Sequence, residues 1–363
     1  MNQTAIPCVV MRGGTSKGLY FHARDLPADV ATRNRVLLAA MGSPDVRQID
    51  GMGGAHPLTS KVAVIGPSSR PDADVDYLFL QVVVDAAEVS ESQNCGNILA
   101  GVGPFAIEQG LVSAVDGETL VRIHMVNTAS IAVAHVSTPG GTVNYAGDAV
   151  IDGVPGSAAP MMLDFLEVAG SSCGALLPTG AVVDTVQGVE VTCIDNGMPV
   201  VLLNAADFGR SGLESPAELE ADPDLKRRIE AIRLEIGPRM NLGQVAKKTV
   251  PKMCLISPAQ HGGAIATRTF IPHRVHESIG VLGAASVAAA CFLPGSVAQK
   301  RSGKIAVAGV HQVNVEHPTG FLTVEIEIDV RGNEVILERS ALLRTARKLM
   351  QGDIFVPRSV LNG

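Results

Sequence analysis

The chain has 363 residues, which at about 150 residues per domain is enough for two domains. It is 46% hydrophobic and 18% charged, so it has ample apolar surface to bury and a disordered chain is excluded. Its longest apolar runs, such as 284–293, are far shorter than the ~20 residues that span a membrane. The net charge of −7, the 3% of aromatic residues and the lack of a basic stripe argue against nucleic-acid binding. A locally positive pocket for an anion remains compatible with that charge.

The six cysteines are scattered singly, without a CxxC pair. This spacing is typical of reduced thiols and not of a disulfide framework or a zinc site. Residues 1–14 contain no basic segment followed by an apolar one, so we expect no signal peptide. A cytoplasmic location is the expectation that follows.

In chain order, short runs rich in valine and isoleucine alternate with Gly, Pro, Asn and Asp, which is typical of a strand-rich protein. Strands are predicted at 6–11, 61–65, 77–84, 120–126, 131–136, 189–194, 200–203, 253–257, 305–310, 321–330 and 334–337. Two surface helices are predicted, one at 31–41 that Gly42 ends and one at 216–236 with a break near Asp222–Pro223.

Two further segments, 96–110 and 283–292, are apolar on every side, so as helices they must be buried all round. Pro104 is expected to kink the first of them. Because they lie half a chain apart, we predict an α+β protein of two similar halves, each a set of strands around one central helix. The boundary is placed near 177–181, giving halves of 1–180 and 181–363, with the last strand free to cross back.

Residues 12–18 (RGGTSKG) combine a guanidinium, an ammonium, two hydroxyls and backbone N–H groups. Such a loop is a good cradle for an anion, which makes Arg12, Thr15, Ser16 and Lys17 candidate ligands of a carboxylate. The alternative of a plain glycine turn stays open. The same letters match the G-x-S-x-G elbow of serine hydrolases, but that elbow needs a helix directly after the serine, and the sequence predicts a strand there.

Two residues are candidates for proton transfer. Lys61 begins an apolar strand; a lysine there usually faces solvent, but burial would lower its pKa and provide a general base. Cys95 opens the first apolar helix between Asn94 and Asn97, where free N–H groups, including that of Gly96, would bind a carboxylate and favour a thiolate. The ordinary alternative for Cys95 is an inert buried thiol.

The start of the second apolar helix, with Ser278, Gly280 and Gly283, could hold a further carboxylate in the same way. His273 and His276 stand three residues apart without a third ligand at a suitable spacing, so no metal site is predicted. The glycine-rich segment 50–54 lacks the G-x-G-x-x-G spacing and a following helix, so it does not indicate a dinucleotide site.

Seven stretches that extend over residues 5–358 resemble one known family. They are MRGGTSKG, DGMGGAHPLTSK, QNCGNILAGVGPFAIE, DGVPGSAAPMMLDF, LLPTG, HESIGVLGAASVA and RTARKLMQGDIFVP. The chain is similar to the diaminopimelate-epimerase-like isomerases and, within them, to the branch of methylaconitate isomerases and 4-oxalomesaconate tautomerases, with the closer match to the tautomerases.

The resemblance implies two pseudo-symmetric halves, each a curved, mostly antiparallel sheet around a central apolar helix, with the active site between them. It implies a proton shift without cofactor or metal, as keto–enol tautomerisation or a 1,3-allylic shift, in the breakdown of gallate or related aromatic acids. The substrate would be a small unsaturated tricarboxylate, with Lys61 and Cys95 as catalytic residues. A homodimer is compatible with the family; no nucleic-acid or membrane partner is expected.

One departure from the family pattern limits the kind of proton transfer that we expect. Amino-acid epimerases of this fold use two cysteines, one at each central helix start, and the second start here has none. This disfavours a two-thiol racemase and suits a proton shift between neighbouring carbons. Methylaconitate and aconitate remain alternative substrates. A non-catalytic polyacid-binding protein and a serine hydrolase are the alternatives from other classes.

Overall fold

The computed structural model describes residues 2–91, 94–166, 169–272, 274–332 and 334–361. The chain divides into two compact units, an N-terminal unit of Met1–Leu163 with Arg344–Gly363 and a C-terminal unit of Asp164–Leu343. The last strand belongs to the N-terminal unit because it pairs with the first strand along its whole length, from Gln3↔Pro357 to Gly13↔Ala346. The division therefore falls before the 180/181 boundary that the sequence suggested.

The N-terminal unit contains the strands β1 (Gln3–Gly13), β2 (Ser16–His22), β3 (Lys61–Pro67), β4 (Val75–Val82), β5 (Val89–Ser90), β6 (Gly117–Met125), β7 (Ser130–Thr138) and β18 (Ala346–Pro357). Its helices are α1 (Val30–Met41), α2 (Gly96–Leu99) and α3 (Val102–Glu108), with the short 3-10 helices η1 (Ala23–Asp25), η2 (Pro57–Thr59), η3 (Pro139–Gly141) and η5 (Arg358–Leu361). Strand β8 (Met161–Leu166) crosses the division.

The C-terminal unit contains β9 (Asp184–Val186), β10 (Val189–Asp195), β11 (Pro199–Asn204), β12 (Lys252–Ser257), β13 (Ile265–Ile271), β14 (Arg274–Val275), β15 (Gly309–His317) and β16 (Gly320–Arg331). Strand β17 (Glu334–Arg344) follows and ends at the division. The helices are α4 (Pro216–Glu220), α5 (Pro223–Arg239), α6 (Val281–Ala290) and α7 (Gln299–Ser302), with η4 (Ala205–Phe208).

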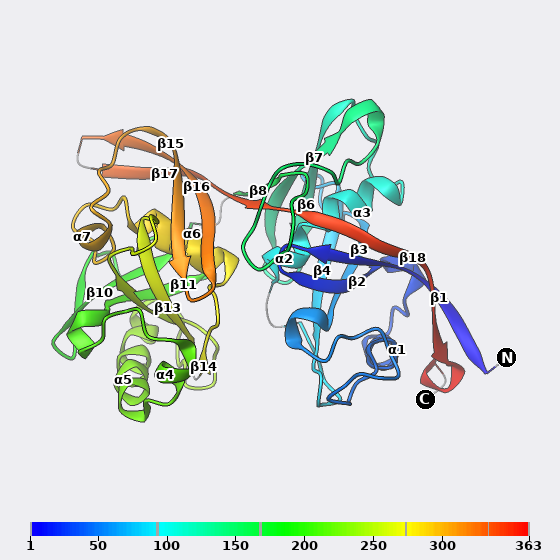
Figure 1. Ribbon diagram of the computed structural model, residues 1–363, viewed down its shortest axis with the longest axis horizontal. Helices are drawn as coiled ribbons and strands as arrows, with labels where there is room; N and C mark the ends of the chain where they lie inside the picture. Colours follow the sequence, from blue (N-terminus) through cyan, green and yellow to red (C-terminus); the bar gives the residue numbers. More distant parts are fainter. Residues whose placement is uncertain (1, 92–93, 167–168, 273, 333, 362–363) are drawn as a thin grey trace. The chain divides into compact units, whose positions relative to one another are not determined.

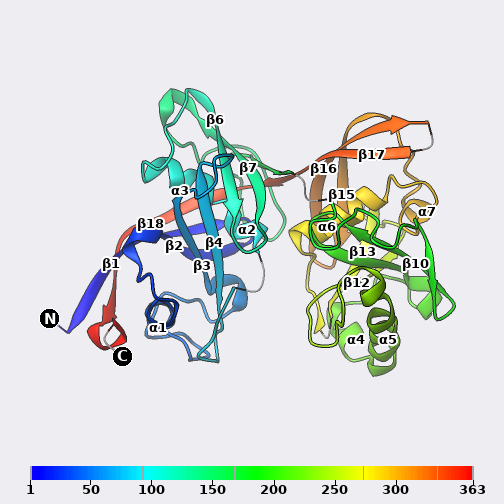
Figure 2. The same cartoon turned by 180° about the vertical axis from the view of Figure 1, so that it is seen from behind.

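The two units repeat one strand order (Figures 1 and 2). In the N-terminal unit β1 is antiparallel to β2, β2 parallel to β3, β3 antiparallel to β4, β4 parallel to β6 and β6 antiparallel to β7. In the C-terminal unit β10, β11, β12, β13, β15 and β16 pair with the same sequence of directions. The short strands β5 and β14 add to β4 and β13 in equivalent places. The prediction of two similar α+β halves is confirmed.

Each unit packs its apolar helix against these strands. Helix α6 contacts β10, β11, β15 and β16, and all its residues except Leu282 are buried. The expected single helix at 96–110 is instead two short helices, α2 and α3, separated at Ala100–Gly101. The break falls four residues before Pro104, whose ring would clash with the carbonyl of Ala100 in a continuous helix. Gly101 is required here because a Cβ at this position would lie 2.5 Å from the Tyr20 hydroxyl.

Most other predicted elements are present, and the exceptions have local causes. Helix α1 ends at Gly42, which adopts a left-handed conformation with φ +76°, and the second surface helix is broken at Asp222 into α4 and α5, as expected. The predicted strand at 305–310 is wrong, because β15 begins at Gly309 and Ile305 is 77% exposed. Strands β8, β13 and β18 and the short strands β5, β9 and β14 were not predicted.

In each unit, one apolar core lies on one face of the sheet, and we use it to define the outer face. In the N-terminal unit Leu19, Phe21, Val62 and Val64 pack with residues of α1, so we call this the outer face and the face that carries α2 and α3 the inner face. In the C-terminal unit the equivalent core joins Met253, Leu255 and their neighbours to α5. Because side chains alternate along a strand, the residues between these apolar positions point to the inner face.

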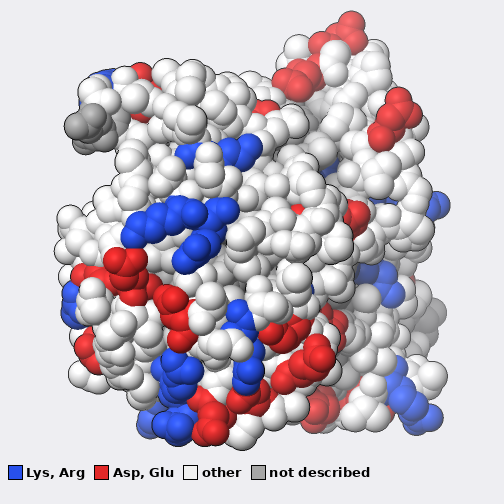
Figure 3. Space-filling view, turned by 60° about the vertical axis from the view of Figure 1, so that its left-hand side comes forward, with Lys and Arg blue, Asp and Glu red and all other residues white. Residues whose placement is uncertain are grey.

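The surface in Figure 3 carries Lys and Arg interspersed with Asp and Glu, most densely in its lower half, and the described residues form no continuous basic stripe there. Among the described helices, none is long and apolar enough to cross a membrane.

Lys252 is the first residue of β12, as Lys61 is the first residue of β3. The buried charge of Lys252 leads to a prediction about stability. Burial, together with the nearby Arg233 guanidinium, lowers the pKa of Lys252 from 10.5 to about 8. Below about pH 8 the folded state bears the full cost of the buried charge. Between about pH 8 and 10.5 the folded state releases this proton first, so the free energy of unfolding rises with pH and then levels off.

We therefore expect Lys252→Met to raise the unfolding midpoint at pH 7, by roughly 2–4 °C for each kcal/mol regained, and to abolish the rise above pH 8. Thermal unfolding followed by circular dichroism between pH 7 and 10 measures both effects. A midpoint that is lower in the variant at pH 7 would contradict the assignment of a destabilising buried charge.

Candidate active site

Lys61 is directed to the inner face of the N-terminal unit. It alternates with Val62 and Val64, which pack in the outer core, and only 7% of it is exposed. Its Nζ donates a hydrogen bond of 2.9 Å to Oε1 of Gln81 and lies 5.0 Å from the centre of the Phe79 ring. The prediction left open whether this lysine faces solvent, and the structure shows that it is buried.

Gln81 is held so that only its oxygen is available to Lys61. Its Nε2 donates to the carbonyl oxygens of Ser60 at 2.8 Å and Pro57 at 3.1 Å. These two acceptors determine the orientation of the amide. No pattern in the sequence indicated Gln81, because its role arises from the β3–β4 register, which places Lys61 opposite Gln81.

Cys95 caps α2 and lies on the same face. Its carbonyl accepts a hydrogen bond of 3.2 Å from the hydroxyl of Tyr77, which shares the inner face of β4 with Phe79 and Gln81. This row of side chains connects the two candidate catalytic residues. The prediction of a long helix whose dipole acts on Cys95 is wrong, because α2 is a single turn. The N–H groups of that turn can still bind an anion, because the first N–H groups of any helix lack partners within it.

Of the six cysteines, Cys95 alone is partly exposed. Burial raises the pKa of Cys8 to about 11 and those of Cys173, Cys193, Cys254 and Cys291 to about 12. These five thiols are therefore unreactive at neutral pH. A buried cation, Arg344, also lies near Cys95: burial lowers its pKa to about 10, and the Cys95 sulfur partly offsets this effect. Arg344 was not among the predicted site residues.

The end of the β1–β2 hairpin presses on the start of α2. A Cβ on Gly13 would lie 2.3 Å from the carbonyl oxygen of Asn97, so only glycine fits at this contact. The Asn97 amide donates to the Thr15 hydroxyl at 3.1 Å. Of the predicted carboxylate ligands, Thr15 and Asn97 are thus neighbours, and Gly96 is the first residue of α2.

Ser16 and Asn94 each contribute a buried oxygen, Ser16 Oγ and Asn94 Oδ1, that has no hydrogen-bond partner within the described part of the chain. The amide nitrogen of Asn94 donates a hydrogen bond of 2.7 Å to the Thr128 hydroxyl. Ser16 opens a strand and not a helix, so the serine-hydrolase alternative is excluded.

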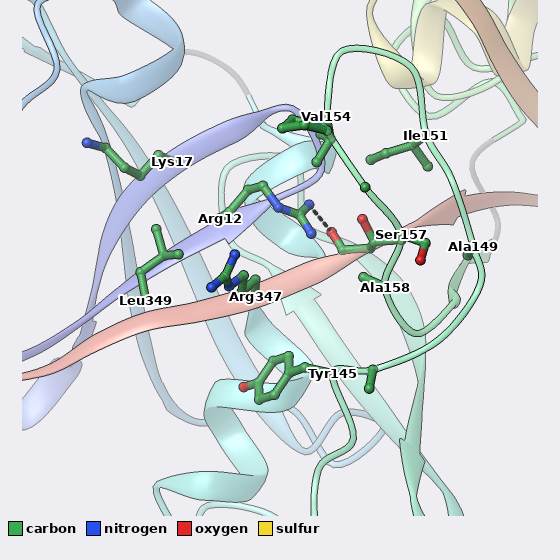
Figure 4. Close-up of a pocket in the computed structure, with 14 residues that line it drawn as sticks. Arg12, Lys17, Tyr145, Ala149, Ile151, Val154, Ser157, Ala158, Arg347 and Leu349 are labelled. Carbon is green, nitrogen blue, oxygen red and sulfur yellow. Dashed lines mark hydrogen bonds between the residues drawn. The ribbon is translucent and has the colours of Figure 1, made fainter.

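Arg12 and Lys17 lie on the other side of the sheet. They are paired across β1 and β2, and Lys17 alternates with the inner-face position Ser16 and shares its face with Leu19 of the outer core. Both line a cavity of about 480 Å³ together with Arg347 and several uncharged residues of the segment 145–158 (Figure 4). The structure therefore divides the predicted anion cradle between two faces.

The residues predicted at the second helix start belong to the C-terminal unit. Ser278 and Gly280 precede α6, and Gly283 lies in its first turn. The Ser278 backbone N–H donates to Nδ1 of His276 at 2.9 Å. His273 lies outside the described residues. Within the described ranges, no group of three or more His, Cys, Asp or Glu residues is arranged to hold a metal.

The family model described as PrpF protein matches residues 3–357. The chain belongs to the PrpF family. It is 60% identical to a (4E)-oxalomesaconate Delta-isomerase of Novosphingobium sp. (strain KA1), over 98% of each chain. It is also 60% identical to a 4-oxalomesaconate tautomerase of Pseudomonas putida, over 100% of this chain and 99% of the relative.

A crystal structure of a methylitaconate-delta-isomerase is 36% identical to this PrpF-family chain and superposes with a TM-score of 0.86, covering 100% of this chain and 98% of that one. These matches confirm the predicted family and fold, and they confirm that the protein is an isomerase.

Proposed function

We propose that this PrpF-family isomerase moves a proton within 4-oxalomesaconate, a small unsaturated tricarboxylate. The observation that carries the proposal is the pair of a buried, oriented amine and a partly exposed thiol, Lys61 and Cys95, on one face of one sheet. The two 60% identical relatives carry the names of a Delta-isomerase and of a tautomerase for this compound. Both names describe a proton that leaves one position and returns at another.

In the proposed reaction, the neutral amine of Lys61 removes a proton from the carbon next to the oxo group. Gln81 accepts one N–H of this amine, which orients the nitrogen towards the substrate. The electron pair of the broken C–H bond passes into a dienolate. Return of the proton to oxygen gives the enol, and return to the far carbon gives the allylic isomer. The Cys95 thiol supplies that proton and becomes a thiolate. The ammonium of Lys61 then gives up the proton that it took, and the thiolate takes one up, through solvent, which restores both groups.

Thr15, Ser16, Asn94, Gly96 and Asn97 are the proposed ligands of the substrate carboxylates in the N-terminal unit. The unpartnered oxygens of Ser16 and Asn94 support this, because each leaves hydrogen-bonding capacity inside a buried setting. At the start of α6, Ser278, Gly280 and Gly283 remain candidate ligands in the C-terminal unit. Fixed carboxylates would align the C–H bond with Lys61, where much of the rate gain arises.

The substrate is tested by incubating the full-length protein separately with 4-oxalomesaconate, methylaconitate and aconitate and recording proton NMR spectra. We expect conversion of 4-oxalomesaconate at the highest kcat/KM. Turnover of methylaconitate or aconitate alone would reassign the substrate, in keeping with the 2-methyl-aconitate isomerase of Cupriavidus necator that is 34% identical. A folded sample that converts none of them would favour a polyacid-binding protein.

Gln81 gives a prediction on the orientation of Lys61. Gln81→Leu removes the acceptor of the lysine N–H, and we expect kcat to fall by up to about 10²-fold while KM changes little. Gln81→Glu keeps an acceptor but adds a negative charge that favours the ammonium form. Its kcat/KM profile should therefore move to higher pH. Normal kcat in Gln81→Leu, or an unmoved profile in Gln81→Glu, would show that Gln81 does not act on Lys61.

A further inference from the structure

The outer face of the N-terminal unit carries a cluster of positive charge that is separate from Lys61 on the inner face. The cavity of about 480 Å³ is lined by Arg12, Lys17 and Arg347, and no Asp or Glu is among its lining residues. Every lining residue belongs to the N-terminal unit. In Figure 4 the guanidinium groups of Arg12 and Arg347 lie close together between β1 and β18. Two such groups side by side in a hollow favour an anion between them.

Much of this hydrogen-bonding capacity is unused. Arg12 donates through Nη1 to the carbonyl oxygens of Gly14 at 2.8 Å and Thr345 at 2.9 Å, and its other N–H groups have no acceptor among the described residues. Nor does any described carboxylate pair with the side chains of Lys17 or Arg347. Burial and the adjacent Arg347 charge both lower the pKa of Arg12. A bound anion would relieve that repulsion.

The rest of the lining indicates what kind of anion fits. Ala149, Ile151 and Val154 form an apolar wall on the side of the cavity away from Lys17 and Arg347, and Leu349 lies beside Arg347. This wall suits a carbon skeleton. The pair of Arg12 and Arg347, together with Lys17, which lies apart from them, suits more than one carboxylate on that skeleton. Inorganic phosphate would use the cations but leave the wall and much of the volume empty.

We propose that this cavity is a binding site for a small di- or tricarboxylate, distinct from the inner face that carries Lys61 and Cys95. The alternation of β1 and β2 separates the two sites, because Ser16 and Lys17 are adjacent on one strand and point to opposite faces. The inference rests on the cavity alone and does not require the proposed reaction.

The absence of tryptophan from the chain allows a direct test. Leu349→Trp places a single fluorescent reporter in the cavity wall, at a position that is 46% exposed. Leu120→Trp provides the matched control on β6, at a position that is 52% exposed and outside the lining. Each variant of the full-length protein is titrated with tricarballylate, the saturated tricarboxylate propane-1,2,3-tricarboxylate, at constant ionic strength.

We expect a saturable fluorescence change with Leu349→Trp and none with Leu120→Trp. Adding Arg347→Met to the reporter variant should weaken binding at least tenfold, and Lys17→Met should weaken it to a smaller extent. Lys348→Met is the control for strand charge, because Lys348 already pairs with Glu108 at 2.9 Å, and binding should stay within about twofold. Adding Lys61→Ala should leave binding unchanged, which separates this site from the reaction.

Three results would overturn the proposal. Equal affinity with and without Arg347→Met, in samples with the same circular dichroism spectrum, would show that the cavity is not the binding site. A saturable change that inorganic phosphate produces as tightly as tricarballylate would contradict the polycarboxylate assignment. Absence of any saturable change with Leu349→Trp would contradict the site itself.

Discussion

Lys61→Ala should reduce kcat for 4-oxalomesaconate by at least about 10²- to 10⁴-fold, the range expected when a general base is removed. The reason is geometric: Lys61 is the buried inner-face amine that Gln81 orients, and alanine leaves no group to accept the proton. Steady-state kinetics by absorbance or NMR measures the loss. KM should change far less than kcat if the residue acts in the chemical step.

The fold should survive this substitution. Alanine leaves the Gln81 oxygen without its donor, at a cost of about 1 kcal/mol, while Val62 and Val64 keep β3 in the outer core. Lys348→Met, which removes another partly buried lysine of the same unit, serves as the control and should retain turnover. Near-normal activity of Lys61→Ala, in a sample with a native circular dichroism spectrum, would remove Lys61 from the mechanism.

Cys95→Ala should lower the rate of product formation by about 10²-fold or more, because the proposed reaction uses this thiol to return the proton. Chemical modification provides an independent measurement. Cys95 is the partly exposed thiol and the other five are buried, so brief treatment with iodoacetamide should add one label, on Cys95, as mass spectrometry of peptides would show.

Activity should be lost in parallel with that label, and substrate should slow both. Cys95→Ala is the control for the chemistry of labelling, since it should take up no label under the same conditions. Full activity after complete labelling of Cys95 would contradict any role for this thiol in the reaction. Rapid labelling of Cys254 or Cys291 would contradict the burial that raises their pKa.

The sequence indicated the parts of this site that lie within single segments. Lys61 at the start of an apolar strand and Cys95 at the start of an apolar segment are both visible as local patterns. Gln81 and Arg344 are not, because their roles depend on pairing between strands and on folding of the C-terminal end onto the first strand. No local pattern marks such contacts between distant residues.

The segment 12–18 shows that a local sequence pattern can also predict a site that strand geometry divides. If the whole segment were a loop, its residues would form one anion-binding site. Instead Gly13 ends β1 and Ser16 begins β2, so the alternation of side chains along the strands divides them between two faces. The single long helix predicted at 96–110 failed for a similar reason. Its composition fits a buried helix, whereas Pro104 and the contact of Gly101 with Tyr20 determine where it breaks.

The central claim is that Lys61 transfers a proton at carbon, and deuterium uptake tests it most directly. The wild-type protein and Lys61→Ala are each incubated with 4-oxalomesaconate in heavy water and followed by proton NMR. We predict that the wild type introduces deuterium at carbon while new product resonances appear, and that Lys61→Ala does neither above the rate without enzyme. Deuterium uptake by Lys61→Ala at the wild-type rate would contradict the account.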